Sequence, residues 1–213
     1  MSRDTIDKAK KESVRTRLLE AALASIRRKG YSATSVDELC AIAGVTKGGF
    51  FHHFKSKEAL GVAAADFWSE MTGALFANAP YHEPDDPLER VMAYIDFRSA
   101  LIDGPVEEFT CLVGTMVQEV YGSSDAIRAA CDASISGHAA TLEIDLEAAM
   151  QKYGRTDGVS AQSLALHTQA VLQGGFILAK AKGGAEIAKD SAAHLKRYIR
   201  LLFQAEVQHK NQS

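Results

Sequence analysis

Cysteine is scarce in this chain, and its spacing argues against two kinds of site. The 213 residues include three cysteines, Cys40, Cys111 and Cys131. An odd number of widely separated cysteines does not suit a disulfide framework, and none has the close spacing of a zinc site. The sequence therefore predicts free thiols in a reducing cytoplasm and no metal ligand.

Long apolar runs are also missing. Hydrophobic residues make up 46% of the chain, but no stretch approaches the roughly 20 consecutive apolar residues that cross a bilayer. The first residues, Met1–Glu12, are polar and charged, unlike a cleavable signal peptide. We therefore expect a cytoplasmic protein with a sizeable core and no membrane partner.

The signatures of catalysis are absent from the sequence. It has no nucleophilic serine elbow, no phosphate-binding loop and no pair of carboxylates in an apolar context. Adjacent acids occur at Asp85 and Asp86 and at Glu107 and Glu108, where they are typical of solvated loop and helix-start charges. We therefore predict no catalytic residue, no cofactor and no enzymatic activity.

Neither positive nor negative charge dominates the whole chain, but the charges are unevenly distributed along it. The formal net charge is −3. Residues 1–60 hold 12 Lys and Arg against 7 Asp and Glu, a net of +5, whereas residues 61–213 hold 12 against 20, a net of −8. A basic N-terminal part on an acidic body is typical of a nucleic-acid-binding module joined to a second domain.

Helical periodicity runs through most of the chain. Apolar residues recur at three- and four-residue intervals, and glycine or proline clusters separate the periodic segments. The pattern predicts an all-α fold of nine helices without a strand. The expected helices span residues 14–29, 36–43, 46–54, 56–77, 88–102, 106–121, 125–153, 160–182 and 185–207.

Two of these helices are short and joined by a tight turn, as in a helix-turn-helix. Ser35 and Glu38 form a capping box that starts the first helix at residue 36. Gly44 can adopt positive φ and end that helix, and Val45 is an apolar plug after the turn. Thr46 is a suitable N-cap for the second helix.

The second short helix has an unusual outer face. Phe50 and Phe54 are four residues apart and can both face the core. Gly48 and Gly49 are poor helix formers, but they would allow the backbone to approach a duplex closely. A groove-reading helix needs such a face. The residues expected on it are Lys47, Gly48, Phe51 and His52, with His53 at its edge.

Residues 34–60, with the helix before them, resemble the DNA-binding region of the TetR/AcrR family of bacterial transcriptional regulators. The resemblance covers about the first quarter of the chain and includes Thr-Ser-Val-Asp-Glu-Leu, Ala-Gly-Val-Thr-Lys-Gly and Phe-His-His-Phe-Lys-Ser-Lys-Glu-Ala-Leu. Phe51 stands where the family commonly has a phosphate-binding tyrosine, and Gly49 stands where a branched residue is frequent. Both departures affect the expected base readout rather than the binding mode.

The resemblance implies a two-domain regulator. A flexible arm of residues 1–12 would precede a three-helix DNA-binding domain of residues 13–60 and a ligand-binding and dimerisation body of residues 61–213. Its partners would be a double-stranded DNA operator, a second copy of the chain and an unidentified small-molecule effector. Contacts with the duplex are expected from Ser35, Thr46, Lys47, Gly48, Gly49, Phe51, His52, His53 and Lys57.

The middle helices should enclose the effector if the resemblance holds, although each candidate residue could equally belong to the core. The candidates are Phe67, Met71, Phe97, Leu101, Phe109, Cys111, Met116, Ile135 and His138. Cys111 lies early in the helix expected from residue 106, where a helix dipole lowers a thiol pKa. It is therefore also a candidate thiol sensor, whereas the charges of Glu107 and Glu108 oppose that role.

The last two helices carry more apolar residues than one packed face requires. In the family, such helices form a four-helix interface between subunits. The alternative is that these residues are buried within one subunit, because patterning indicates burial but not the packing partner. The candidate interface residues are Leu164, Val171, Gly174, Gly175, Leu178, Leu195, Tyr198 and Leu202.

These features lead to one functional hypothesis and one alternative. The hypothesis is a ligand-responsive regulator, most often a repressor in the family, that binds a palindromic operator as a dimer and is released by a small molecule. Lys47, Phe51 and His52 would contact bases, while Thr46, Lys57 and the backbone near Ser35 would contact phosphates. The alternative is an architectural or partner-recruiting DNA-binding protein without a small-molecule signal.

Overall fold

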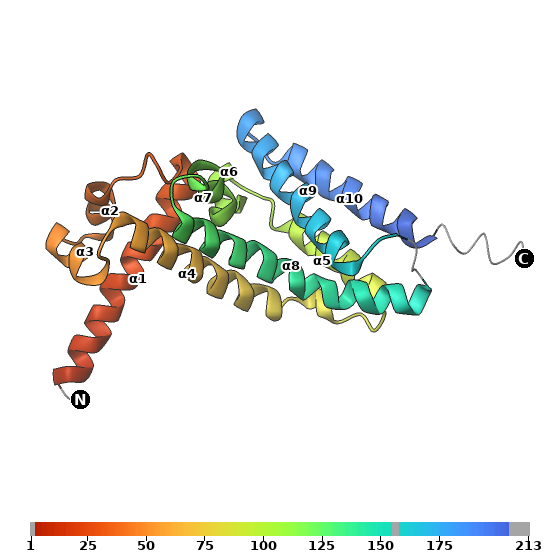
Figure 1. The fold of residues 1–213 in the computed structure, drawn as a ribbon, viewed down its shortest axis with the longest axis horizontal. Helices are drawn as coiled ribbons and strands as arrows, with labels where there is room; N and C mark the ends of the chain where they lie inside the picture. The colour runs from red at the N-terminus through yellow and green to blue at the C-terminus, as the bar shows by residue number, and fades with distance from the viewer. Residues whose placement is uncertain (1–2, 155–157, 205–213) are drawn as a thin grey trace, which may run out of the picture. The chain divides into compact units, whose positions relative to one another are not determined.

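Helices form all the regular structure of the described chain. The computed structural model describes residues 3–154 and 158–204, with side chains from Val14 onward. Within these ranges the chain forms ten α-helices and a short 3-10 helix, with no strand, which confirms the prediction of an all-α fold (Figure 1). The elements are α1 (Arg3–Lys29), α2 (Val36–Ala43), α3 (Lys47–His53), α4 (Lys57–Ala77), η1 (Pro80–His82), α5 (Pro87–Ala100), α6 (Val106–Phe109), α7 (Leu112–Val120), α8 (Asp125–Tyr153), α9 (Ala161–Lys182) and α10 (Glu186–Gln204).

Two predicted helices differ from those in the structure. Helix α1 begins at Arg3 rather than at Val14, so most of the predicted flexible arm is helical. The single helix predicted for residues 106–121 is two helices, because Thr110 and Cys111 both have extended backbone angles. This break makes the count ten rather than nine. The predicted end of the last helix, at residue 207, lies outside the described residues.

The chain divides into two units. The first contains α1 to α3, α4 up to Gly73, and Cys111–Ser134, which includes α7 and the start of α8. The second contains Ala74–Thr110 and the chain from Ile135 onward. The boundaries fall inside α4 and α8. The predicted functional boundary between residues 60 and 61 stays a prediction.

The first unit is built around side chains that are almost inaccessible to solvent. Leu18, Leu39, Phe50 and Leu60 come from the four N-terminal helices, and each is at most 1% exposed. Met116 of α7 and Ile127 of α8 are fully buried in the same unit. Two parts of the predicted body, residues 61–73 and 111–134, therefore belong to the unit that carries the two short helices.

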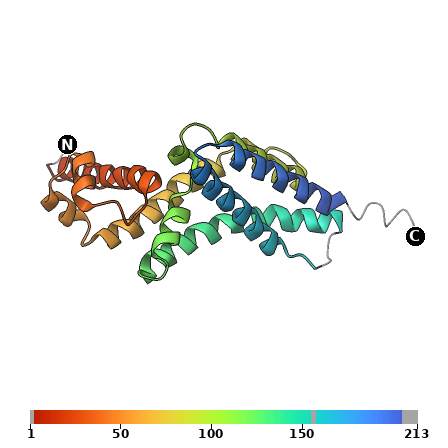
Figure 2. The ribbon, with the colours of Figure 1, turned by 90° about the horizontal axis from the view of Figure 1, so that it is seen from above.

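The second unit has its own apolar core, formed by α5, α8, α9 and α10. Helices α9 and α10 pack side by side, as Figures 1 and 2 show from two directions. Gly175 permits this close approach, because a Cβ at that position would lie 3.3 Å from the Cα of Ala188. Core residues of these helices include Val91, Tyr94, Leu146, Leu172 and Ile199.

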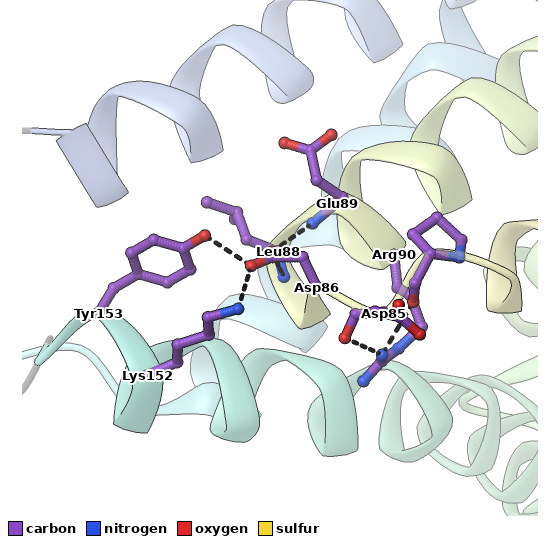
Figure 3. A network of polar contacts seen from close by, with 8 residues as sticks. Asp85, Asp86, Leu88, Glu89, Arg90, Lys152 and Tyr153 are labelled. Atoms are coloured by element: carbon purple, nitrogen blue, oxygen red, sulfur yellow. Dashed lines mark hydrogen bonds and ion pairs between the residues drawn. The ribbon is translucent and has the colours of Figure 1, made fainter.

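The start of α5 is held by a polar network (Figure 3). One carboxylate oxygen of Asp86 accepts hydrogen bonds from the backbone N–H groups of Leu88 and Glu89, at 2.8 and 3.0 Å. Its other oxygen accepts hydrogen bonds from Lys152 Nζ at 2.6 Å and from the Tyr153 hydroxyl at 2.7 Å. The expectation that Asp86 is simply a solvated loop charge was therefore wrong.

Candidate nucleic-acid interface and effector site

Helices α2 and α3 begin and end as their local sequence predicts. Ser35 Oγ accepts the backbone N–H of Glu38 at 3.2 Å, and Thr46 Oγ1 accepts the backbone N–H of Gly49 at 3.1 Å. Gly44 lies between the helices with φ +62° and ψ +42° in the left-handed region. These three residues thereby fix the short turn of a helix-turn-helix.

Helix α3 has an apolar inner side and an exposed outer side. Phe50 is fully buried, and Phe54, which follows the helix, is 4% exposed. On the other side Lys47 and His52 are exposed, and the Phe51 ring is 51% exposed. An exposed phenylalanine beside a cation and an imidazole is suited to contact the edges of bases.

Lys47 forms an exposed ion pair with a neighbouring helix. Its Nζ lies 2.8 Å from Asp37 Oδ1 of α2, and both side chains are more than 60% exposed. The hydrogen bond and charge of Asp37 raise the pKa of Lys47 above its ordinary value. Because an exposed ion pair is weak, a guanine or a phosphate can replace Asp37 at little cost.

The two glycines of α3 are not required by packing within the subunit. A Cβ at Gly48 would meet Thr46 Oγ1 at 3.9 Å, and a Cβ at Gly49 would meet the same atom at 3.4 Å. Both distances are compatible with ordinary contact. The described chain therefore gives no steric reason for glycine at either position, whereas close approach to a duplex would provide one.

The residues predicted to contact the DNA backbone differ in exposure and in hydrogen-bond partners. Ser35 and Thr46 are exposed, and a hydroxyl that accepts a cap hydrogen bond can still donate its proton to a phosphate. His53 is half-buried at the edge of the outer face. Lys57 is engaged with the α1–α2 loop: its Nζ donates to Ser32 O at 3.3 Å and lies 4.3 Å from the centre of the Tyr31 ring.

The same loop is also bound by α7. Glu119 accepts hydrogen bonds from the backbone N–H groups of Tyr31 and Ser32, at 3.1 and 2.7 Å. Gly30 has φ +93°, and a Cβ there would lie 2.1 Å from Glu119 Oε1. Burial, and secondarily the charge of Glu58, raise the pKa of Tyr31. We call the contacts among Gly30, Tyr31, Ser32, Lys57 and Glu119 the loop clamp. Sequence analysis missed it, because the partners are far apart in the chain.

The predicted effector residues are not all brought together. Phe67, Met71, Cys111 and Met116 belong to the first unit, where Met71 is 44% exposed and Met116 is fully buried. Leu101, in the second unit, is 40% exposed. Ile135 is half-buried, and Phe109 packs on Phe176 with ring centres 6.2 Å apart. Only two of the candidates meet the same ring: Phe97 and His138 both contact Phe76, with ring centres 5.6 and 4.4 Å away.

Three polar residues beside His138 were missed by sequence analysis. The hydroxyl of Tyr94 and the Nη1 of Arg98, both on α5, lie 2.9 and 3.2 Å from His138 Nε2. Gln169 of α9 donates to the Tyr94 hydroxyl at 3.2 Å. We call these four residues the polar cluster. The four-residue spacing of Tyr94 and Arg98 on a largely apolar helix was the available signal.

Cys111 is the most accessible of the three cysteines. It is half-buried at the N-cap of α7, and its Sγ accepts the backbone N–H of Gly114 at 3.4 Å. Burial raises the pKa of Cys131 to about 12 and also raises the pKa of Cys40. Cys111 caps α7 rather than lying within a helix that begins at residue 106. The helix N-terminus beside its thiol is therefore that of α7. Its role as a thiol sensor stays a prediction.

The predicted interface residues divide into buried and exposed sets. Leu164 and Leu195 are each 2% exposed within the second unit, and Gly175 is buried against Ala188. These three are buried in the core of a single chain, whereas their assignment to an intersubunit surface stays a prediction. Val171, Gly174 and Leu202 are half-buried, whereas Leu178 and Tyr198 are 45% and 44% exposed.

Other exposed apolar residues lie on these two helices. Leu166 and Ile177 of α9 are 44% and 47% exposed, and Leu201 of α10 is 65% exposed. The rings of His167 and Tyr198 meet with centres 5.3 Å apart, so the exposed sides of the helices adjoin. We call the exposed apolar residues the α9–α10 face. They are Leu166, Ile177, Leu178, Tyr198 and Leu201.

The geometry defines the class of protein as an all-helical helix-turn-helix DNA-binding protein with a second helical unit. Residues 18–64 match the family described as "Bacterial regulatory proteins, tetR family". Residues 87–194, slightly more than half of the chain, match "Transcriptional regulator LmrA/YxaF-like, C-terminal domain". The chain therefore belongs to the TetR/AcrR family of bacterial transcriptional regulators.

Named relatives extend this finding. The transcriptional regulator AcuR of Cereibacter sphaeroides is 31% identical over 113 residues, which cover 53% of this chain and 52% of AcuR. The chain thus spans about half the length of the first relatives that it matches. The transcriptional repressor NemR of Escherichia coli is 26% identical over 201 residues, covering 91% of this chain and 98% of NemR.

Solved structures support the fold. A TetR-family regulator from Agrobacterium tumefaciens has a TM-score of 0.77 at 22% identity and covers 88% of this chain and 98% of its own. The reduced form of Escherichia coli NemR has a TM-score of 0.71 at 25% identity and covers 86% and 96%. Within the described residues, no helix is both long and apolar enough to cross a membrane.

Proposed function

We propose that the protein is a ligand-responsive repressor that binds a palindromic operator as a homodimer and leaves it when a small molecule binds the second unit. The observation that carries this proposal is the outward position of Lys47, Phe51 and His52 on a helix anchored by Phe50 and Phe54. Two relatives, DhaR and NemR, are named as transcriptional repressors, which supports repression rather than activation.

In this proposal, α3 enters the major groove. Lys47 donates to the O6 and N7 atoms of guanine, and the Phe51 ring contacts a thymine methyl group. Thr46 and the backbone near Ser35 contact phosphates and set the register. Lys57 adds a third contact, because its ammonium has three donors and can bind a phosphate while it keeps Ser32 O. The effector must bind the released state more tightly than the operator-bound state, because equal affinity would shift no equilibrium.

The α9–α10 face supports the dimer. A twofold pair reads two half-sites whose centres are about 34–36 Å apart, one turn of B-DNA. A monomer leaves the apolar side chains of this face in water, and a second copy of the same face is the complement that a closed dimer requires. The dimeric association of family members agrees with this arrangement.

Charges placed in the α9–α10 face should separate the subunits. The double variant Leu178→Asp and Leu201→Asp would bury uncompensated carboxylates, so we expect at least about 100-fold weaker self-association. Sedimentation velocity of wild type and variant measures this directly. Leu75→Asp is the matched control, because Leu75 is 47% exposed in the same unit but outside the face. A wild-type protein that sediments as a monomer at micromolar concentration would contradict the dimer.

Lys47 should contribute to both affinity and sequence preference. Once genomic fragments selected by the protein have defined an operator, Lys47→Ala is expected to weaken binding by roughly 5- to 150-fold. It should also relax the preference for guanine at one position in each half-site. Fluorescence anisotropy with the operator and its single-base variants measures both effects.

The control is Lys182→Ala, which removes an exposed cation at the end of α9. It should leave operator affinity and base preference unchanged. If Lys47→Ala bound every sequence as the wild type does, the assignment of α3 to the groove would be wrong. The architectural alternative predicts that no small molecule alters the affinity, and the polar cluster favours the sensor over that alternative.

A further inference from the structure

The polar cluster has an excess of hydrogen-bond donors. Arg98 is donor-only, so it can share a hydrogen bond with His138 Nε2 only if that nitrogen carries a lone pair. The ring must then be neutral, with its proton on Nδ1. Burial, helped by the charge of Arg98, lowers the pKa of His138 to about 4, which agrees with a neutral ring.

The Tyr94 hydroxyl adds a second donor to the same atom. Because Nε2 then carries no proton, the Tyr94 hydroxyl, whose oxygen accepts the hydrogen bond from Gln169 Nε2, donates its own proton to His138 Nε2 at 2.9 Å. A neutral imidazole nitrogen has one lone pair, yet both Tyr94 and Arg98 approach it. At His138 Nε2, the hydrogen-bond donors therefore outnumber the lone pairs that can accept them.

Arg98 also lacks a negative partner. Among the described side chains no carboxylate forms an ion pair with it, and Asp145 of α8 pairs with Arg90 instead, at 2.7 Å. The guanidinium lies over the rings of Phe76, Tyr94 and Phe176, 5.2, 6.0 and 5.9 Å from their centres. A half-buried cation among aromatic rings is suited to an anion that brings both charge and apolar surface.

We propose that the polar cluster binds the carboxylate of an apolar organic acid, and that such an acid is the effector class of this regulator. The Arg98 guanidinium would hold the carboxylate through parallel N–H hydrogen bonds, and Tyr94 would turn its hydroxyl from His138 to the ligand. Phe76, Tyr81 and Phe97, whose ring centres lie within 6.4 Å of one another, supply apolar surface for the remainder of the acid.

The net charge of the polar cluster favours a carboxylate ligand over a phosphate. The cluster contains one guanidinium and a neutral imidazole, which match a single negative charge. A doubly charged phosphate would leave one charge uncompensated among aromatic rings. This inference rests on the proposed ligand response, and its test is independent of DNA.

Calorimetric titration of the full chain tests the inference. The probes are hexanoate, octanoate, benzoate and phenylacetate, each paired with its primary amide, and inorganic phosphate. We expect at least one acid to bind at least about tenfold more tightly than its amide, because only the acid supplies the anion that Arg98 lacks. Phosphate should not bind.

Variants of Arg98 test whether its guanidinium causes the preference for an acid over its amide. In Arg98→Gln the ratio of acid to amide affinity should fall to about one, and Arg98→Lys should retain part of it, since lysine keeps the charge but not the planar fork. Arg128→Gln is the control, because Arg128 is an exposed arginine of α8 in the first unit, paired with Asp125. Far-ultraviolet circular dichroism shows that each variant folds. The acid-to-amide ratio reports recognition rather than stability.

The outcomes separate this inference from the proposed function. Equal binding of acids and amides, unchanged selectivity in Arg98→Gln, preferential phosphate binding, or no acid binding up to about 10 mM would each overturn the inference. Operator binding, with release by a neutral compound, would then leave the proposed function standing. Conversely, selective acid binding without any operator binding would uphold the carboxylate site and overturn the repressor.

Discussion

Replacing Asp86 by alanine should destabilise the second unit by about 2–3 kcal/mol. The carboxylate caps α5 through two backbone hydrogen bonds, a contribution of about 1 kcal/mol. It also binds Lys152 and Tyr153 at the end of α8, and charge-assisted hydrogen bonds add about 1–2 kcal/mol. In a chain of this size the loss corresponds to roughly 4–12 °C in thermal midpoint, measured by circular dichroism.

The effect of Asp86 should depend on pH. Burial alone would raise the pKa of this carboxyl, but hydrogen bonds from Lys152, Tyr153 and the backbone outweigh burial and hold the pKa well below its usual range. Because the pKa is lower in the folded than in the unfolded state, the stabilisation is present above about pH 4 and is lost as the pH falls further. The wild type and Asp86→Ala should therefore differ most at neutral pH, and the difference should narrow in acid.

Two further variants separate the contributions of the individual contacts of Asp86. Tyr153→Phe removes one hydroxyl and should cost about 1 kcal/mol. Asp86→Asn keeps an oxygen that can cap α5 but loses the charge, so it should lie between Tyr153→Phe and Asp86→Ala. If Asp86→Ala melted within 1 °C of the wild type, the contacts of Asp86 drawn in Figure 3 would contribute nothing measurable.

Features of the DNA-binding part could be predicted because their causes are local. Ser35 and Thr46 cap the helices that follow them through backbone groups three residues away, and Gly44 supplies the left-handed turn. The inward position of Phe50 and Phe54 follows from their four-residue spacing. Each feature depends on a short stretch of chain, so one sequence contains the information.

The features that sequence analysis missed depend on contacts across many residues. Asp86 looks solvated in its own segment, but its partners lie 66 and 67 residues away. Apolar spacing correctly indicated that Leu164 and Leu195 are buried, yet it could not show that they are buried within their own subunit. A similar limit applies to Arg98: that no carboxylate among the described side chains pairs with it becomes visible only when α5, α8 and α9 are placed together.

Gly30→Ala should damage the loop clamp and, with it, operator binding. A residue with a Cβ is unfavourable at φ +93°, and the new methyl group would lie 2.1 Å from Glu119 Oε1. Glu119 can swing away, but only by giving up its hydrogen bonds to Tyr31 and Ser32. We expect a loss of about 2–3 kcal/mol in stability, combining strain with these lost bonds. Thermal melting measures this loss.

A double-mutant cycle identifies the cause. Glu119→Ala removes the carboxylate, so in the double variant the methyl group at residue 30 meets no oxygen and only the backbone strain remains. The stability lost in the double variant Gly30→Ala/Glu119→Ala should therefore be about 1–2 kcal/mol smaller than the sum of the stabilities lost in the two single variants. Additive losses would show that residue 30 acts through φ alone.

The clamp should also affect DNA affinity, because the loop that it holds leads directly into α2. Glu119 holds the loop from α7, and Lys57 holds Ser32 and Tyr31 from α4. These contacts are expected to set the angle at which α2 and α3 are presented to DNA. Gly30→Ala and Glu119→Ala should therefore each bind the operator at least about tenfold more weakly. Lys47–Asp37 and the outer face of α3 remain intact in these variants, so the loss must come from positioning. Unchanged operator affinity in Glu119→Ala would show that α7 supports the fold of this unit without orienting its DNA-binding surface.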